Sequence, residues 1–173
     1  MIDPTNAPIY QKKQFDLWPP SKDNIADSLY PYIKRMKQDN VKILLIGDLL
    51  GEDAVRFFEL NENDKIKRID VVNQSNPYPE SLKANIEGND RISIVETGEG
   101  KEYDLVFINS ENKSLDETMK SNYTCVKSNG VFCGNNHHKT YVKEALGKFR
   151  RETKIGTPIS VSNRLCWFWI KRE

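Results

Sequence analysis

The chain has 173 residues, of which 29% are charged, and its formal net charge at pH 7 is +1. This length suits one domain around one core, and the balanced charge gives no overall field that would attract nucleic acid or an anionic membrane. No stretch approaches the roughly 18 apolar residues of a membrane-spanning helix, and the first 20 residues lack an apolar leader segment. The cysteines, which have no C-x-x-C spacing, favour a reduced, cytoplasmic protein over a disulfide framework: Cys125, Cys133 and Cys166.

The first part of the chain predicts an irregular arm followed by a helix. Residues 1–20 contain four prolines and no sustained hydrophobic period, so we expect an arm there and a single α/β domain over residues 21–173. Ser21 is a candidate N-cap for a helix that reaches about residue 40. The apolar side chains of this helix share one face, and Pro31 predicts a kink or a break near Tyr30.

Short apolar runs then alternate with amphipathic segments. The runs VKILLIG, KIKRIDVVN and RISIVE predict strands, and LGEDAVRFFELN and PESLKANIEG predict the helices between them, the second ending at Gly88. YDLVFIN, residues 103–109, predicts a further strand. The segment from 114 to 130 predicts a helix with its exit turn, and GVFCG predicts a strand.

The last third of the chain predicts one helix and two strands. The helix KTYVKEALGKFRRE should direct inward the side chains of Tyr141, Val142, Ala145 and Phe149. The segments TPISVS and LCWFWIKR follow, and in the second we expect both tryptophans to pack into the core. Because only residues 162–164 link the two segments, they should form a hairpin whose final strand is antiparallel to its neighbour.

This alternation predicts an α/β fold with a mostly parallel sheet covered by helices on both faces. In such folds ligands bind beyond the carboxyl ends of the strands, where the loops diverge. After the first strand, Gly47 and Gly51 allow a ligand to approach the backbone, although a plain tight turn explains them equally well. Asp48, between them, either caps the next helix or contacts a ligand amine; capping is the simpler interpretation.

Later strand ends supply further candidates. Asp70 lies 19 residues beyond Gly51, a spacing from which a carboxylate can bind ribose hydroxyls, but Asn73 takes that position if the strand continues through VVN. Gly98 and Glu99 follow the third strand and are candidates for the base end of a nucleotide, with a surface turn as the alternative.

The fourth and fifth strands end in amides rather than acids. Asn109 ends one strand, and Asn135 and Asn136 follow the other, next to His137 and His138. An amide neither holds a hard cation by charge nor takes up a proton, but it donates and accepts hydrogen bonds. His137 is a candidate general base, with a solvated loop pair as the alternative.

The segments from VKILLIGDLLGEDA to KTYVKEALGKF, with DLVFINSEN and NGVFCGNNHH between them, resemble the class I S-adenosylmethionine (SAM)-dependent methyltransferases. The resemblance implies a Rossmann-like sandwich with a seven-stranded, mostly parallel sheet and an antiparallel C-terminal hairpin strand. It implies that SAM is bound by Gly47, Gly51 and Asp70, with Gly98 or Glu99 near adenine. Two departures stand out: Leu45 replaces an acid often found two residues before the first glycine, and the strand-end acids are asparagines.

The resemblance therefore implies a methyltransferase that acts on a small molecule without a metal. Asp48, Asn73 and Asn109 complete the expected cofactor contacts, and we expect His137, Asn109 and Asn136 at the catalytic centre. The alternative is a catalytically inactive binding or partner protein that keeps this fold. A homodimer formed through an exposed edge or through the arm is an open possibility. A receiver-type signalling domain is disfavoured because no strand end offers a cluster of acids.

Overall fold

The computed structural model describes residues 25–47, 51–74, 80–110, 114–162 and 166–172. The expected arm over residues 1–20, the proposed cap Ser21 and the turn residue Asp48 lie outside these ranges. The boundary of the domain at residue 21 therefore stays a prediction.

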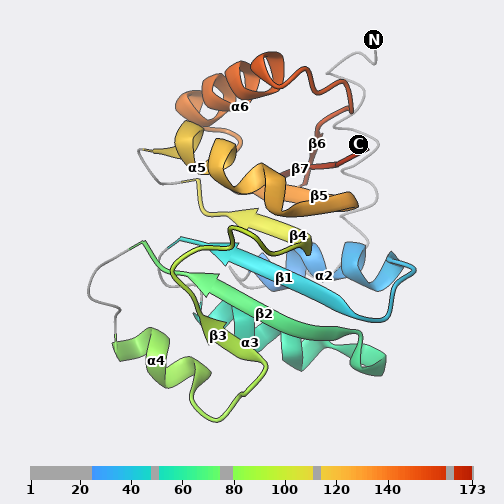
Figure 1. Ribbon diagram of the computed structural model, residues 1–173, viewed down its shortest axis with the longest axis vertical. Coiled ribbons are helices and arrows are strands. Elements are labelled where there is room, and N and C mark those ends of the chain that lie inside the picture. The colour runs from blue at the N-terminus through green and yellow to red at the C-terminus, as the bar shows by residue number, and fades with distance from the viewer. Residues whose placement is uncertain (1–24, 48–50, 75–79, 111–113, 163–165, 173) are drawn as a thin grey trace.

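Seven strands form one sheet in the order β3-β2-β1-β4-β5-β7-β6 (Figure 1). Strands β1 to β5 are parallel, whereas β7 is antiparallel to both β5 and β6. The strands span Val41–Ile46, Ile66–Val72, Ile92–Ile94, Tyr103–Ile108, Val126–Gly134, Ser160–Val161 and Trp167–Ile170, from β1 to β7. The predicted seven-stranded, mostly parallel sheet and its antiparallel C-terminal hairpin are confirmed.

Helices cover both faces of the sheet. One face packs on α2 and α3 around an apolar cluster that includes Ile43 and Phe57, and α4 lies beside α3 on this side. The other face packs on α5 and α6 around a cluster that includes Phe132 and Trp167. The helices span Ile25–Arg35, Gly51–Leu60, Glu80–Ile86, Leu115–Asn122 and Thr140–Glu152, from α2 to α6.

The connection from β3 to β4 contains no helix, although it must return from the carboxyl end of one strand to the amino end of the other. Residues 95–102 instead run over the sheet on the α5 and α6 side. Gly98 lies directly on β1, since a Cβ atom there would come within 2.5 Å of the Leu44 side chain. Without a helix to cover them, the amino-terminal parts of β1 and β2 remain accessible on this face.

Three local expectations needed correction. Strand β5 begins at Val126, so residues 126–129 extend a strand rather than an exit turn. Helix α2 continues through Pro31 instead of breaking near Tyr30. Tyr141 is 43% exposed, whereas Leu146 of the same helix, which was not predicted to face inward, is buried.

The C-terminal strand contributes the largest side chains of the core. Trp167 and Trp169 are buried and stacked, with their ring centroids 5.5 Å apart. Both contact the ring of Phe132 on the neighbouring β5. The prediction that the tryptophans pack into the core is confirmed. In the part of the chain that the structure describes, no helix is long and apolar enough to cross a membrane.

Candidate functional site

The carboxyl ends of the central strands meet at one edge of the sheet. Ile46, the last residue of β1, lies opposite Val72 of β2 and Ile108 of β4, and Ile108 lies opposite Gly134 of β5. The residues that follow these ends therefore adjoin one another: Gly47, Asn73, Asn109 and Asn135. We call this group the strand-end site.

Gly47 occupies the position at which the chain leaves β1. Its N–H donates to the carbonyl of Val72 over 2.9 Å, and its φ of 139° is one that a residue with a side chain rarely adopts. A glycine is favoured here because it adopts this backbone conformation without the steric cost that a side chain would bring. Gly51 is the first residue of α3.

Asp70 and Asn73 lie in different surroundings. Strand β2 runs to Val72, so Asp70 is in mid-strand and only 1% exposed. Its carboxylate accepts from Arg68 Nε over 2.8 Å and from the Tyr103 hydroxyl over 2.7 Å. Asn73 follows the strand and lies beside Gly47. It is the residue that the sequence offered as the alternative to Asp70 for the ribose contact.

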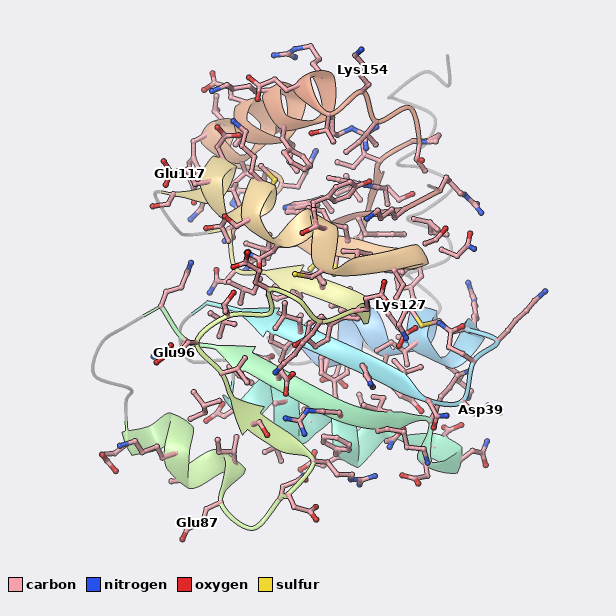
Figure 2. The ribbon with its side chains drawn as sticks, viewed as in Figure 1. Asp39, Glu87, Glu96, Glu117, Lys127 and Lys154 are labelled. Atoms are coloured by element: carbon pink, nitrogen blue, oxygen red, sulfur yellow. The ribbon has the colours of Figure 1, made fainter. Side chains whose placement is uncertain are left out.

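Gly98 and Glu99 belong to the connection that crosses the sheet. Gly98 packs on Leu44, and its carbonyl accepts from the Cys125 thiol over 3.3 Å. Glu99 is exposed, and its N–H donates to the Thr97 hydroxyl over 3.0 Å. The residue that lies near the strand ends in this connection is Glu96, which Figure 2 labels beside the carboxyl ends of β1 and β2.

The ends of β4 and β5 are joined through side chains. Asn135 accepts from the Ser110 N–H over 2.6 Å and donates to the Asn109 side-chain oxygen over 3.3 Å. Trp167 Nε1 donates to the Ser110 hydroxyl, 3.2 Å away, and to the Asn135 carbonyl, 3.1 Å away. The Tyr141 hydroxyl donates to the Ser110 carbonyl over 2.9 Å. These bonds fix the two strand ends relative to each other.

Ser110, Tyr141 and Trp167 were not predicted as parts of this site. Trp167 and Tyr141 come from β7 and α6, so only the tertiary fold brings them to the end of β4. Ser110 directly follows the predicted Asn109, and its place in INSE, after a buried strand, was the one signal that could have identified it.

Asn136 and His137 extend the strand-end site beyond β5. Asn136 has a φ of 57°, and its carbonyl accepts from the Lys139 N–H over 3.0 Å, which turns the chain toward α6. Burial lowers the pKa of His137, and the nearby charges of Lys143 and His138 lower it further. The imidazole is therefore neutral at pH 7 and able to accept a proton. His138 is exposed.

The first turn of α3 carries two acids, Glu52 and Asp53. Asp53 accepts from the Ile25 N–H at the start of α2 over 3.0 Å. Burial raises the pKa of Asp53 to about 6, and the charges of Glu52 and Asp27 add to this rise. A negative charge at a helix N-terminus attracts an ammonium group and disfavours a second carboxylate. Glu52, which is exposed, is therefore the acid of this turn that an ammonium group can approach.

Metal-ligating side chains do not gather in the described residues, where no three His, Cys, Asp or Glu side chains are placed to hold one ion. The donors at the strand-end site are amides, a hydroxyl and backbone groups. Hard cations prefer carboxylate oxygens, so this donor set favours hydrogen-bonded organic ligands.

Comparison with known proteins gives structural likeness alone. The sequence matches no protein-family model and no curated protein. A putative caffeoyl-CoA O-methyltransferase from Staphylococcus aureus has a TM-score of 0.63 at 16% identity, over 98% of this chain and 93% of that one. An O-methyltransferase from Bacillus cereus in complex with S-adenosylhomocysteine (SAH) has a TM-score of 0.60 at 13% identity, over 99% and 92%.

A third structure covers somewhat less of this chain and has a similar fold. Precorrin-6y C5,15-methyltransferase from Geobacter metallireducens GS-15 has a TM-score of 0.62 at 17% identity, over 90% of this chain and 93% of that one. The three likenesses and the strand order establish that this chain has the class I methyltransferase fold.

The chemistry of the strand-end site fits SAM in most respects. Gly47 has a backbone conformation that favours glycine, Asn73 places an amide beside it although its side chain is largely buried, and Glu52 is an exposed acid in the first turn of α3. The cofactor's carboxylate fits less well, because the acids Glu52 and Asp53 in the first turn of α3 would repel it.

Proposed function

We propose that this protein is a SAM-dependent methyltransferase that acts on a small molecule and needs no metal. The observation that carries the proposal is the strand order of the methyltransferase fold, combined with a glycine turn after β1 and polar side chains after β2, β4 and β5 at the same edge. This edge is where open α/β sheets bind their ligands.

Binding of the cofactor is assigned to the ends of β1 and β2. In this proposal Gly47 and Gly51 lie against the methionine part, and Asn73 hydrogen-bonds the ribose. Asp70 is less suited to that role because Arg68 and Tyr103 already occupy its carboxylate. Adenine is assigned to the segment after β3, where Glu99 and Gly98 were expected and where Glu96 lies nearer the strand ends.

Substrate is assigned to the ends of β4 and β5. SAM supplies an electrophilic methyl group, so the protein's task is to hold a nucleophile in line with it and to take up the nucleophile's proton where it has one. His137 is suited to accept that proton, since its lowered pKa keeps the imidazole neutral. Asn109 and Asn136 are suited to orient a polar substrate. The amides that end β4 and β5 support the proposed independence from metal.

Calorimetric titration tests the proposal. The purified protein, stripped of any bound cofactor, is titrated with SAM and with SAH in the presence of EDTA, and then with magnesium. We expect binding in the micromolar range that magnesium does not change. Failure of both compounds to bind would refute the assignment of the cofactor, and binding that requires magnesium would refute metal independence.

A second candidate function is a catalytically inactive binding or partner protein. It is favoured by one observation: the Asn109 side-chain oxygen already accepts a bond from Asn135, where a catalytic acid would face the substrate. Incubation with methyl-labelled SAM and a fractionated metabolite extract separates the two. Transfer of label to a small molecule that stops in the His137→Gln variant supports the enzyme. Tight binding of SAM without any transfer supports the inactive protein.

The proposed small-molecule substrate has no established identity, and dimerisation and a cytoplasmic location stay predictions. Light scattering on the purified protein tests dimerisation directly. A mass that corresponds to two chains would support it, and a mass of one chain would refute it.

A further inference from the structure

A polar hollow lies at the opposite end of the sheet from the strand-end site. Its volume is about 700 Å³, and it is lined by Lys42, Arg68, Asp70, Gly100, Lys101, Glu102, Tyr103 and Lys127. We call it the amino-end hollow, because Lys42, Tyr103 and Lys127 stand at or next to the first residues of β1, β4 and β5. Figure 2 labels Lys127 at this end and Glu96 at the other.

The hollow exists because the connection from β3 to β4 has no helix. A helix in that position would cover the face of β1 and β2, whereas residues 95–102, which form neither helix nor strand, leave the amino-terminal parts of these strands open. Gly98, which packs on Leu44, separates the hollow from the carboxyl ends of the strands. The two sites therefore share one sheet but not their lining.

In the hollow, the acidic groups are mostly buried and the basic groups are mostly exposed. Asp70 and Asp104 are 1% and 2% exposed and lie beneath the cations that they bind. Arg68, Lys101 and Lys127 expose 44%, 50% and 36% of their side chains. Solvent thus meets mainly positive charge, with Glu102 as the one acid that is both exposed and part of the lining.

Asp70 holds the cations in place. Its carboxylate bonds Arg68 Nε over 2.8 Å and lies 3.7 Å from Lys101 Nζ. Arg68 Nη2 also donates to the Ser93 hydroxyl over 3.0 Å, which fixes the plane of the guanidinium group. Burial and the bond to Asp70 raise the pKa of Tyr103, so its hydroxyl remains a donor to Asp70. A guanidinium group fixed in this way is prepared to bind an anion with little loss of entropy.

Lys42 provides a positive charge that no acid among the described residues pairs with. Lys127 pairs with Asp104 over 3.3 Å, and Arg68 and Lys101 share Asp70. For Lys42, by contrast, the described residues offer no ion-pair partner, although its side chain lines the same hollow. A ligand with negative charge would complete the arrangement.

We propose that the amino-end hollow binds a small phosphate-bearing molecule. Fixed arginine and mobile lysines together suit a phosphate group, which offers several oxygens and up to two negative charges. The cations line one hollow of limited volume rather than a continuous stripe, and the chain's net charge is only +1. Both facts favour a single phosphomonoester over the backbone of a nucleic acid. This proposal does not depend on methyltransferase activity.

Calorimetry at low ionic strength provides the test, with glycerol 3-phosphate as the probe, glycerol as the uncharged control and inorganic phosphate in parallel. These probes avoid adenosine, which the strand-end site would bind. Lys42→Ala is the main variant because the removal of this lysine leaves no carboxylate of the hollow without its ion-pair partner. We expect it to weaken binding of glycerol 3-phosphate about tenfold. The matched control is Lys67→Ala, which removes a lysine of β2 that pairs with Asp64 and does not line the hollow.

The outcomes separate the sources of phosphate. Binding of glycerol 3-phosphate that Lys42→Ala weakens and Lys67→Ala leaves unchanged supports the proposal. Equal affinity for inorganic phosphate would mean that the hollow contacts the phosphate group and not the rest of the molecule, and this outcome also supports the proposal. Absence of binding, or equal losses in both variants, overturns it. Tighter binding of a short single-stranded RNA, lost in Lys42→Ala, overturns the small-molecule assignment. Circular dichroism verifies that each variant is folded.

Discussion

The side chains of Asn109 and Asn135 are hydrogen-bonded to each other over 3.3 Å, and this contact joins the ends of β4 and β5. Asn135 also accepts from the N–H of Ser110, a residue that is fully buried. The two asparagines therefore act first as a structural connection at the edge of the sheet. A carboxylate in both positions would place two negative charges in contact, which explains why amides suit this arrangement.

Substitution of Asn135 tests this connection. Asn135→Ala removes the acceptor of the buried Ser110 N–H, and we expect the free energy of unfolding to fall by about 1–3 kcal/mol. Urea denaturation measures the loss. The control is Asn40→Ala at an exposed position before β1, which should change stability by less than about 0.5 kcal/mol. A loss in Asn135→Ala no greater than in the control would show that the connection contributes nothing.

The sequence predicted the strand ends correctly as the edge where polar groups gather, because hydrophobic runs that end in small polar residues mark buried strands. It could not predict which side chains point to that edge. Asp70 satisfied the spacing expected of a ribose ligand, yet the end of β2 at Val72 leaves it in mid-strand against Arg68 and Tyr103. Where a strand ends, and therefore which side chains reach the edge, depends on how strands that are distant in sequence pair with one another. This pairing cannot be seen in the local sequence.

Asn73 provides a test of the cofactor assignment. A carboxylate accepts bonds from ribose hydroxyls more strongly than an amide oxygen does, so Asn73→Asp should tighten the binding of SAH about fivefold. Asn73→Ala should weaken it. Asp70→Asn serves as the control and should leave the affinity for SAH unchanged. Calorimetry measures the affinity of all three variants for SAH. If only Asp70→Asn lost affinity, the ribose contact would be Asp70, in the middle of β2, rather than Asn73.

Gly134 tests the packing beneath the strand-end site. A Cβ atom there would overlap the Trp167 ring and lie 2.7 Å from the Ile108 carbonyl oxygen. We expect Gly134→Ala to destabilise the fold by about 1–3 kcal/mol, since Trp167 cannot move without disturbing its bonds to Ser110 and Asn135. Thermal denaturation measures the change.

Gly156→Ala is the matched control for Gly134→Ala. No atom lies within 4 Å of the position that a Cβ would take at Gly156, so the substitution should be neutral or stabilise by up to about 1 kcal/mol. Similar melting temperatures for the two variants would contradict the close packing of Trp167 on Gly134.

The fold was easier to predict than its details. Alternating strands and helices are encoded locally, and the short link at 162–164 required the terminal hairpin, so the architecture followed from the sequence. The start of β5 was missed because VKSN is mostly polar, and its place in the sheet depends on pairing with β4 at Tyr103. Pro31 predicted a kink or a break, and α2 continues through it without a break.

The buried acid Asp53 predicts an unusual dependence of stability on pH. Its pKa is about 6 in the fold and near 3.8 when exposed, so the folded state favours the protonated form. Ionisation of Asp53 therefore destabilises the fold progressively as pH rises from about 4 to 6, and the full cost remains above pH 6. Two pKa units correspond to roughly 3 kcal/mol.

Asp53→Asn removes this cost while retaining an oxygen that can accept from the Ile25 N–H. We expect the variant to be more stable than the original protein at pH 7.5, by up to about 3 kcal/mol, and by only about 1 kcal/mol at pH 4.5. Urea denaturation at the two pH values measures the difference. Glu59→Gln, an exposed acid on the same helix, should show no such dependence. A gain for Asp53→Asn that is equal at both pH values would mean that Asp53 titrates normally and that burial does not govern it.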